Sequence, residues 1–208
     1  MALLHRAKLH PTKLELLAAW LPSRRWYQGQ TVAGLELVAA YRFDDPAGMV
    51  GIETMLVRAG DGPIHQVPVT YRDAPLDGDD RLIGTAEHSV LGQRWVYDAC
   101  RDPAYVAALA VAILADGGQA EQFFEVDGRR EVRQPTMTIT ASGSADADIP
   151  AIGSLHRIDD DDPTRIVTDR VELAVVRRLD ATVALPGVTL TGTWGGHTPL
   201  SLACASMR

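Results

Sequence analysis

The chain has 208 residues, 46% of them hydrophobic, and a formal net charge of −7. The length suits one domain or a domain with a smaller appendage, and the negative charge excludes a general affinity for nucleic acid or anionic membranes. No apolar run approaches the roughly 18 residues that a membrane helix needs, and the N-terminus lacks the apolar core of a signal peptide. We therefore expect a cytoplasmic protein with reduced thiols at Cys100 and Cys204.

The first elements are predicted as a short strand and a helix. Residues 2–9 favour a strand, and Thr12 with Glu15 forms a T-x-x-E capping box that predicts a helix start. Pro22 is expected to end this helix. Its apolar face is predicted to contain Leu14, Leu17, Ala18 and Leu21.

A basic and aromatic loop follows the helix, from Arg24 to Tyr27. One interpretation is a ligand platform, in which Trp26 and its neighbours provide stacking or cation–π contacts. The other is that Trp26 folds back under the helix as a core residue, and we favour this second interpretation.

The next three segments alternate in hydrophobicity and predict strands over 35–42, 50–58 and 64–72. The turns between them are rich in Asp, Gly and Pro. Pro68 lies inside the third segment and suggests an edge strand or a bulge, because proline cannot donate to a strand ladder.

Residues 81–114 predict strand, tight turn, strand and capped helix, with Gly92 at the turn. Asp102 is suited to cap the helix and Pro103 fits its first position. Because the turns are short, we expect an α+β fold in which one antiparallel sheet carries both helices on one face. The apolar face of the second helix is predicted to contain Tyr105, Val106, Leu109, Ala112 and Ile113.

The second half is predicted to be mostly β, with a hairpin turn at Asp127-Gly128. The acidic run 159–162 lacks the spacing of a calcium loop and is interpreted as a solvated loop. We divide the chain into residues 1–118 and a β-rich region, 119–208, packed on the first. Leftover strand edges are expected to mediate self-association into a homo-oligomer. Strands are predicted at 136–141, 166–179, 188–193 and 200–203.

Four segments together resemble the N-terminal cap domain of actinobacterial maltokinases: HPTKLELLAAWLPSRRWYQG, FDDPAGMVGIE, HQVPVTYRDAPLDG and IGTAEHSVLGQRWVYDACRDPAYVAAL. The similarity covers about residues 8–115 and is greatest to small stand-alone proteins with a cap-like domain and no kinase body, some of them labelled α-glucan branching proteins. The resemblance implies a curved antiparallel sheet with packed helices, similar to the cystatin fold. It also implies that this part carries no residues for phosphoryl transfer.

Residues 137–180 resemble the next part of the kinase N-lobe, with ASGSADA at the loop and ELAVVRRLD at the strand. The nucleotide lysine of that strand would fall within 173–175, where this chain has Leu, Ala and Val, and the last lysine of the chain is Lys13. No H-x-D catalytic element occurs. We therefore expect a degenerate lobe without kinase activity, and the chain is too short for the barrel of a branching enzyme.

Glu87 and His88 are the pair most suggestive of catalysis, but we favour the interpretation of His88 as a hydrogen-bonded polar residue on the sheet. Adjacent strand residues point to opposite faces, so its partner would be Glu53 or His65 rather than Glu87. A small enzyme with a pocket on the sheet, using His88 and a carboxylate, is the alternative interpretation. The sequence shows no metal-ligand spacing and no G-x-S-x-G motif, and no cofactor is expected.

The resemblance favours a non-catalytic binding or regulatory module of α-glucan, maltose or trehalose metabolism. Its partner would be an enzyme of such a pathway or a sugar. Aromatic rings and arginines suit both kinds of contact. The candidate contact residues are Trp26, Tyr27, His88, Arg94, Trp95 and Trp194.

Overall fold

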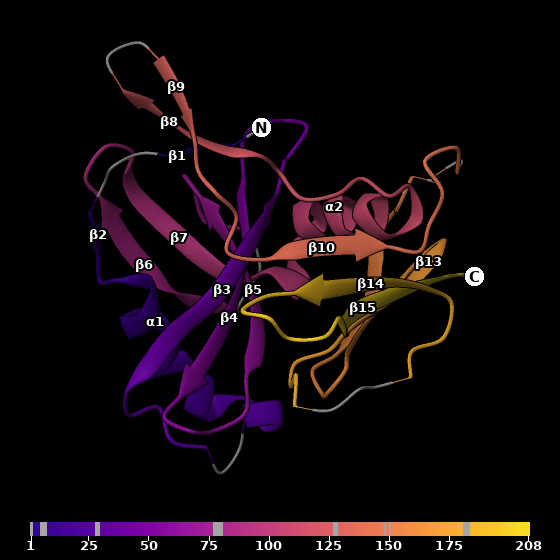
Figure 1. Ribbon diagram of the computed structural model, residues 1–208, viewed down its shortest axis with the longest axis horizontal. Helices are drawn as coiled ribbons and strands as arrows, with labels where there is room; N and C mark the ends of the chain where they lie inside the picture. Colours follow the sequence, from indigo (N-terminus) through magenta and orange to yellow (C-terminus); the bar gives the residue numbers. More distant parts are fainter. Residues whose placement is uncertain are drawn as a thin grey trace.

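The computed structural model describes residues 2–4, 8–27, 30–76, 81–126, 129–147, 149, 151–180 and 184–208. This part of the chain forms three β-sheets and two α-helices (Figure 1). The predicted turn at Asp127-Gly128 and the middle of the predicted strand 2–9 lie outside the described residues.

The first sheet contains six strands in the order β2-β6-β7-β5-β4-β3, and all neighbours are antiparallel. This confirms the predicted antiparallel sheet and the three strands predicted between residues 35 and 72. The strands are β2 (Leu9–His10), β3 (Leu35–Phe43), β4 (Gly51–Ala59), β5 (His65–Arg72), β6 (Leu82–His88) and β7 (Gly92–Asp98).

Helix α1 (Lys13–Trp20) begins with the predicted capping box. The backbone N–H of Thr12 donates to Glu15 Oε2 at 2.7 Å, and the backbone N–H of Glu15 donates to Thr12 Oγ1 at 3.3 Å. The helix continues into the short 3₁₀ helices η1 (Leu21–Ser23) and η2 (Arg25–Tyr27). The buried face of the helix differs from the predicted one, since Leu14 and Ala18 are only partly buried. The buried residues are Leu16, Leu17, Trp20 and Leu21.

Helix α2 (Pro103–Leu114) follows β7 through η3 (Ala99–Arg101). The Asp102 side chain caps it, accepting from the backbone N–H of Ala104 at 2.9 Å, as predicted. The same carboxylate accepts two hydrogen bonds from Arg72, at 2.7 and 2.8 Å, which ties the helix start to β5. All five residues predicted for the apolar face are buried.

The two helices lie on opposite faces of the first sheet, so the prediction that one face carries both is wrong. Helix α1 packs over Met55 and Val57, whereas Leu56, between them on β4, belongs to the cluster of α2. Because β4 buries side chains on both faces, each face requires its own covering layer.

The second half forms a second antiparallel sheet in the order β10-β14-β15-β13-β12-β11, and a small sheet in the order β1-β8-β9. Helix α2 lies between the two large sheets, in contact with β3, β10, β14 and β15 (Figure 1). The strands are β1 (Ala2–Leu4), β8 (Gln122–Val126), β9 (Arg129–Val132), β10 (Thr138–Ala141), β11 (Leu155–Asp159), β12 (Thr164–Thr168), β13 (Val171–Val175), β14 (Val188–Thr193) and β15 (Leu200–Met207).

The predicted long strand 166–179 is in fact a hairpin of β12 and β13. The Thr168 hydroxyl closes its turn, accepting the backbone N–H of Val171 at 3.0 Å and donating to the Val171 carbonyl at 2.8 Å. The polar Asp169-Arg170 pair between two β-branched runs is a turn signal that the strand prediction overlooked.

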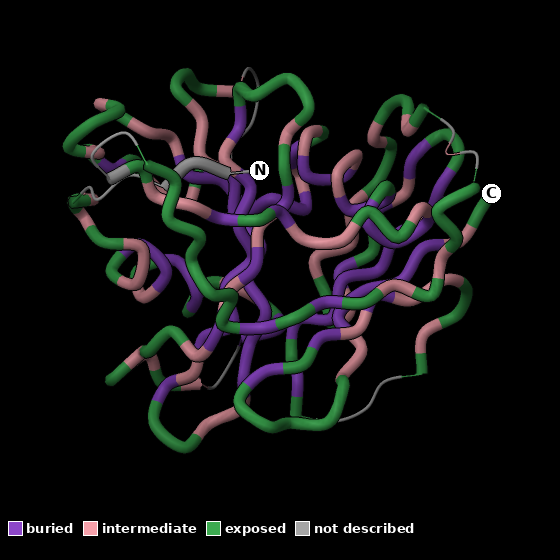
Figure 2. Tube along the Cα trace, turned by 45° about the horizontal axis from the view of Figure 1, so that its top comes forward, coloured by how far each residue is buried: buried purple, intermediate pink, exposed green. Residues whose placement is uncertain are grey.

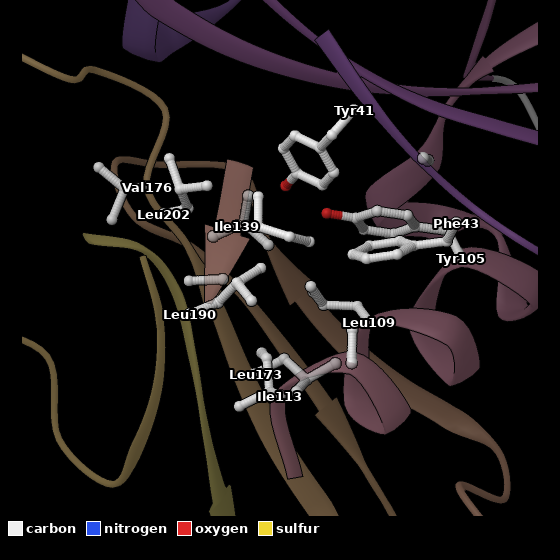
Figure 3. Close-up of a cluster of buried hydrophobic side chains, with 14 of the residues drawn as sticks. Tyr41, Phe43, Tyr105, Leu109, Ile113, Ile139, Leu173, Val176, Leu190 and Leu202 are labelled. Atoms are coloured by element: carbon white, nitrogen blue, oxygen red, sulfur yellow. The ribbon is translucent and has the colours of Figure 1, made fainter. Parts of the chain in front are cut away.

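One apolar cluster joins the two large sheets through α2. Figure 3 shows Tyr41 and Phe43 of β3 directed toward side chains of α2 and the second sheet. Figure 2 shows the buried residues gathered in these inner strands and the exposed ones in the loops. The side chains of this cluster that come from α2 and the second sheet and are labelled in Figure 3 are Tyr105, Leu109, Ile113, Ile139, Leu173, Leu190 and Leu202.

Strand β5 is central in the first sheet, so the edge position that Pro68 suggested is wrong. Pairing with β7 begins only at Val69, and Pro68 lies just past the end of that strand. At the end of β5 that β7 does not reach, residues after β13 form backbone hydrogen bonds with the chain at and just before β5. The backbone N–H of Gln66 donates to the Arg177 carbonyl, and that of Leu179 donates to the Ile64 carbonyl, both at 2.8 Å.

Candidate functional site

The six candidate contact residues lie in three separate places. Trp26 and Tyr27 are in η2, where the two halves meet. His88, Arg94 and Trp95 belong to the β6–β7 hairpin. A third place, directly after β14 in the second sheet, holds Trp194.

A buried ion pair lies where the two halves meet, and we call its surroundings the junction. Arg177 Nη2 donates to both carboxylate oxygens of Asp98, at 2.9 and 3.0 Å, and Arg177 Nε donates to Thr164 Oγ1 at 2.8 Å. Both charged side chains are almost completely buried. Burial opposes the guanidinium charge, but the charge and hydrogen bonds of Asp98, together with the nearby Cys100 and Asp160, outweigh burial and raise the pKa of Arg177, so the group stays protonated.

The aromatic residues of η2 cover this ion pair. The Arg177 guanidinium lies 4.7 Å from the centroid of the Trp26 ring, and the Trp26 and Trp20 rings meet edge to face at 5.9 Å. Tyr27 packs on His65 at 4.6 Å. Burial and the nearby Arg178 lower the pKa of His65 to about 4, so its ring is neutral at pH 7. The burial of Trp26 agrees with the core interpretation and leaves its ring facing protein.

The interpretation of the acidic run as a solvated loop holds only in part, because Asp161 and Asp162 are exposed whereas Asp160 is partly buried in the junction. Asp160 accepts from Trp26 Nε1 at 3.0 Å and from Arg24 Nη1 at 3.4 Å. Asp162 Oδ1 accepts the backbone N–H of Arg177 at 2.8 Å. The arginine pairs at 24–25 and 177–178 were the available signal for this contact, since a run of acids needs opposite charge when it is partly buried.

A second buried carboxylate, Glu53, lies on the α1 face of the first sheet. It accepts from Lys13 Nζ at 2.5 Å and from the Tyr71 hydroxyl at 2.8 Å. Burial alone would raise the pKa of Glu53. The charges of Lys13 and Arg42, with the two hydrogen bonds, outweigh burial and lower the pKa to about 2. The last lysine of the chain therefore has a structural partner.

The strand order separates His88 from the carboxylate suggested for it. Three strand spacings lie between β6 and β4, about 14 Å in all. Glu53 pairs with Val69 of β5, and Val69 pairs with Asp98 at the end of β7. His88 instead pairs with Gly92 at the start of β7. Those two β7 positions are six residues apart, or about 20 Å. The pair of His88 and Glu53 is therefore wrong as a catalytic site.

His65 is also distant from His88, since β5 is two strands from β6 and His65 lies at the far end of β5, by the junction. His88 instead shapes the turn after β6. Its Nδ1 accepts the backbone N–H groups of Val90 and Leu91, at 3.3 and 3.1 Å. Arg94 Nη2 donates to the Leu91 carbonyl at 2.6 Å and holds the same turn.

The opposite face of this hairpin presents an aromatic ring among polar groups. Thr85 is directly opposite Trp95, and Glu87 is directly opposite Gln93, so these four side chains share a face. Trp95 is partly exposed and the other three are exposed. Leu82, also exposed, precedes them on β6. We call this surface the Trp95 face.

Trp194 is a core residue of the second sheet. It is buried and packs against His197, with ring centroids 5.4 Å apart. Its ring is thus removed from the surface and from the other candidate contact residues.

A shallow hollow of about 280 Å³ lies between the end of β3 and the second half of α2. Phe43, Ala108 and Val111 give it an apolar lining. The Gln119 amide at its rim is bonded to β10, donating to the Met137 carbonyl at 3.1 Å and accepting the backbone N–H of Ile139 at 3.0 Å. Within the described ranges, no three His, Cys, Asp or Glu side chains cluster in a way that could hold a metal ion.

The comparisons with known proteins agree with the resemblance noted in the sequence. Residues 20–102 match the family model of the maltokinase N-terminal cap domain. This segment, which spans β3 to β7, is therefore similar to the cap domain, while α2 and the second sheet lie beyond the matched residues. No curated protein matches the chain. None of the helices in the described part is long and apolar enough to cross a membrane.

Replacing Asp98 by Asn should lower the free energy of unfolding by about 3–5 kcal/mol, because Arg177 would remain buried without its carboxylate. Urea unfolding at pH 7 measures this change. Asp180→Asn is the matched control, since it removes the exposed partner of the neighbouring Arg178 and should cost at most about 1 kcal/mol. Equal losses in the two variants would contradict a special role of the buried pair.

Glu53 should make stability depend on pH. Its pKa is about 2 in the folded chain and 4.5 as an ordinary carboxyl group. Its contribution is therefore complete above pH 4.5 and is lost as the pH falls toward 2; the shift corresponds to roughly 3 kcal/mol.

Urea unfolding of the original chain and of Glu53→Gln tests this at several pH values. The difference between the two should shrink as the pH falls from about 5 to 2.5. Glu36→Gln, which changes an exposed carboxylate bonded to Arg58, should show no comparable trend. A difference that is constant with pH would disprove the assignment.

Proposed function

We propose that the protein is a non-catalytic sugar-binding module of maltose, trehalose or α-glucan metabolism, and that the Trp95 face is its contact surface. The observation that carries the proposal is the match of residues 20–102 to the maltokinase N-terminal cap domain. The family name links this segment to maltose chemistry, and the matched residues include the whole β6–β7 hairpin.

The use of charged groups inside the chain supports a binding role at the surface. Arg177 and Asp98 are committed to the junction, and Glu53 is committed to Lys13 and Tyr71. Catalytic groups must reach a substrate, whereas these side chains are bonded within the protein.

The chemistry of the Trp95 face suits a carbohydrate. A sugar ring has an apolar face of C–H groups, which can pack on an indole ring, and hydroxyl groups at its edge. Glu87 accepts hydrogen bonds and Gln93 both donates and accepts them. Both side chains lie beside Trp95 on paired strands, and this pairing fixes their spacing.

We further infer that the first sheet corresponds to the cystatin-like cap and the second sheet to a degenerate part of the kinase N-lobe. In support, the strand that resembles the lysine-bearing one is β13, where Leu173, Ala174 and Val175 are buried apolar residues. The free and buried Cys100 and Cys204 suit the reducing cytoplasm in which we place the protein.

Binding of maltose, trehalose and maltoheptaose, measured by titration calorimetry, tests the sugar-binding role. We expect weak binding of the longest glucan, and we expect Trp95→Ala to weaken it at least about tenfold through loss of the stacking surface. Leu37→Ala, at an exposed apolar residue of β3, is the control and should bind as the original chain does. Absence of binding to all three sugars, or binding unchanged in Trp95→Ala, would contradict the proposal.

A coupled assay for ADP release tests the non-catalytic role. We expect no ATP-dependent phosphorylation of maltose or glucosamine, since the chain has no lysine after Lys13 to neutralise a nucleotide phosphate. Turnover above the blank that a single substitution in this chain abolishes would contradict this expectation.

A further inference from the structure

Among the described residues, strand β9 is the outer strand of the small sheet, and no strand pairs with its other edge. It ends the strand order β1-β8-β9, and all four of its residues are exposed. The β8–β9 hairpin projects from the body of the molecule (Figure 1). An edge strand of this kind presents backbone donors and acceptors to which another strand can pair.

The pairing with β8 determines which backbone groups face the open edge. The backbone N–H of Arg133 donates to the Gln122 carbonyl at 2.8 Å. Hydrogen-bonding direction alternates along an antiparallel strand, so the backbone groups of Arg130 and Val132 point away from β8. By the same alternation, the backbone groups of Gln134 also point away from β8.

The side chains of β9 and the residue after it have a self-complementary order. Glu131 and Arg133 share one face, on either side of Val132, which points to the other face. Val132 is opposite Phe123 of β8 and is 50% exposed. When two copies of this strand pair antiparallel with Val132 opposite Val132, the acid of each copy lies opposite the base of the other. The order Glu131-Val132-Arg133 is therefore self-complementary.

We propose that two copies of the chain associate through β9, antiparallel about a two-fold axis that passes beside Val132. Val132 then lies opposite the partner's Val132, and Arg130 lies opposite the partner's Gln134. Glu131 lies opposite the partner's Arg133, and the same ion pair forms a second time by symmetry. The exposed Val132 side chains cover one another, and the backbone groups of β9 that point away from β8 pair with those of the partner's β9.

The charges select this register over its neighbours. Centring the axis on Glu131 would place it opposite the partner's Glu131 and would place Arg129 opposite the partner's Arg133, and like charges directly opposite destabilise a strand pair. Centring it on Arg130 would place two guanidinium groups opposite one another and lose the Val132 contact. A carboxylate accepts more than one hydrogen bond, so the pair with Arg133 is compatible with contacts that Glu131 makes in its own chain.

This interface is independent of the sugar-binding role, because it lies outside the segment that matches the cap domain. It involves only a few residues of each copy. Contacts this small are characteristic of weak and transient association rather than of obligate dimers. The dimer should therefore form in a concentration-dependent manner.

Sedimentation equilibrium of the full chain over a range of concentrations tests the proposal. We expect a reversible dimer, with Glu131→Arg and Arg133→Glu each raising its dissociation constant by about tenfold or more, because each places like charges opposite one another. The double variant E131R/R133E reverses both charges and should restore the dimer. Glu121→Arg, at an exposed residue just before β8, is the control for the change in net charge and should leave the dimer intact.

Val132→Pro provides a test through the backbone. Proline is tolerated on an edge strand where the missing N–H faces solvent, so the variant should keep the thermal unfolding of the original chain. It should nevertheless abolish the dimer, since the outward donor is removed. A chain that stays monomeric up to roughly 200 µM would overturn the proposal, since even weak specific association is measurable there. So would a dimer unaffected by Val132→Pro and the single charge changes, or one that the double variant fails to restore.

Discussion

The arrangement of the molecule depends on the buried ion pair between Arg177 and Asp98. A buried charge costs several kcal/mol unless it has a partner, and each of these side chains is the partner of the other. Asp98 ends β7 in the first half, and Arg177 follows β13 in the second. The pair can be satisfied only when both halves are in place, so it couples the position of one sheet to the position of the other.

The junction explains why the matched segment and the rest of the chain form one body. Trp26 and Asp98 belong to the segment that matches the cap domain, whereas Asp160 and Arg177 lie beyond it. The apolar cluster around α2 connects the same two parts over a larger area. Our functional proposals rest on two exposed surfaces away from the junction, the Trp95 face and the outer edge of β9.

Local signals in the sequence predicted the local structure well. The capping box at Thr12 and the Asp102 cap are read from a few adjacent residues, and both form as predicted. The burial of Arg177 was not predictable in this way, since its partner Asp98 is 79 residues distant and either charge alone resembles a solvated one. The helices on opposite faces were missed because β4 was interpreted as an alternating strand, although its run Met55-Leu56-Val57 is buried on both faces. Of the candidate contact residues, Trp95 is partly exposed, whereas Trp26 and Trp194 are in the core, and composition alone cannot distinguish such tryptophans.

Hydrogen exchange in the native state tests the central claim, that the junction couples the two sheets into one cooperative unit. The amides of β5 and β13, in the original chain and in Asp98→Asn, report the free energy of opening in each half. The account predicts that both strands open with the same free energy and that the substitution lowers both by the same amount. Two distinct opening free energies, with only β5 affected by the substitution, would contradict it.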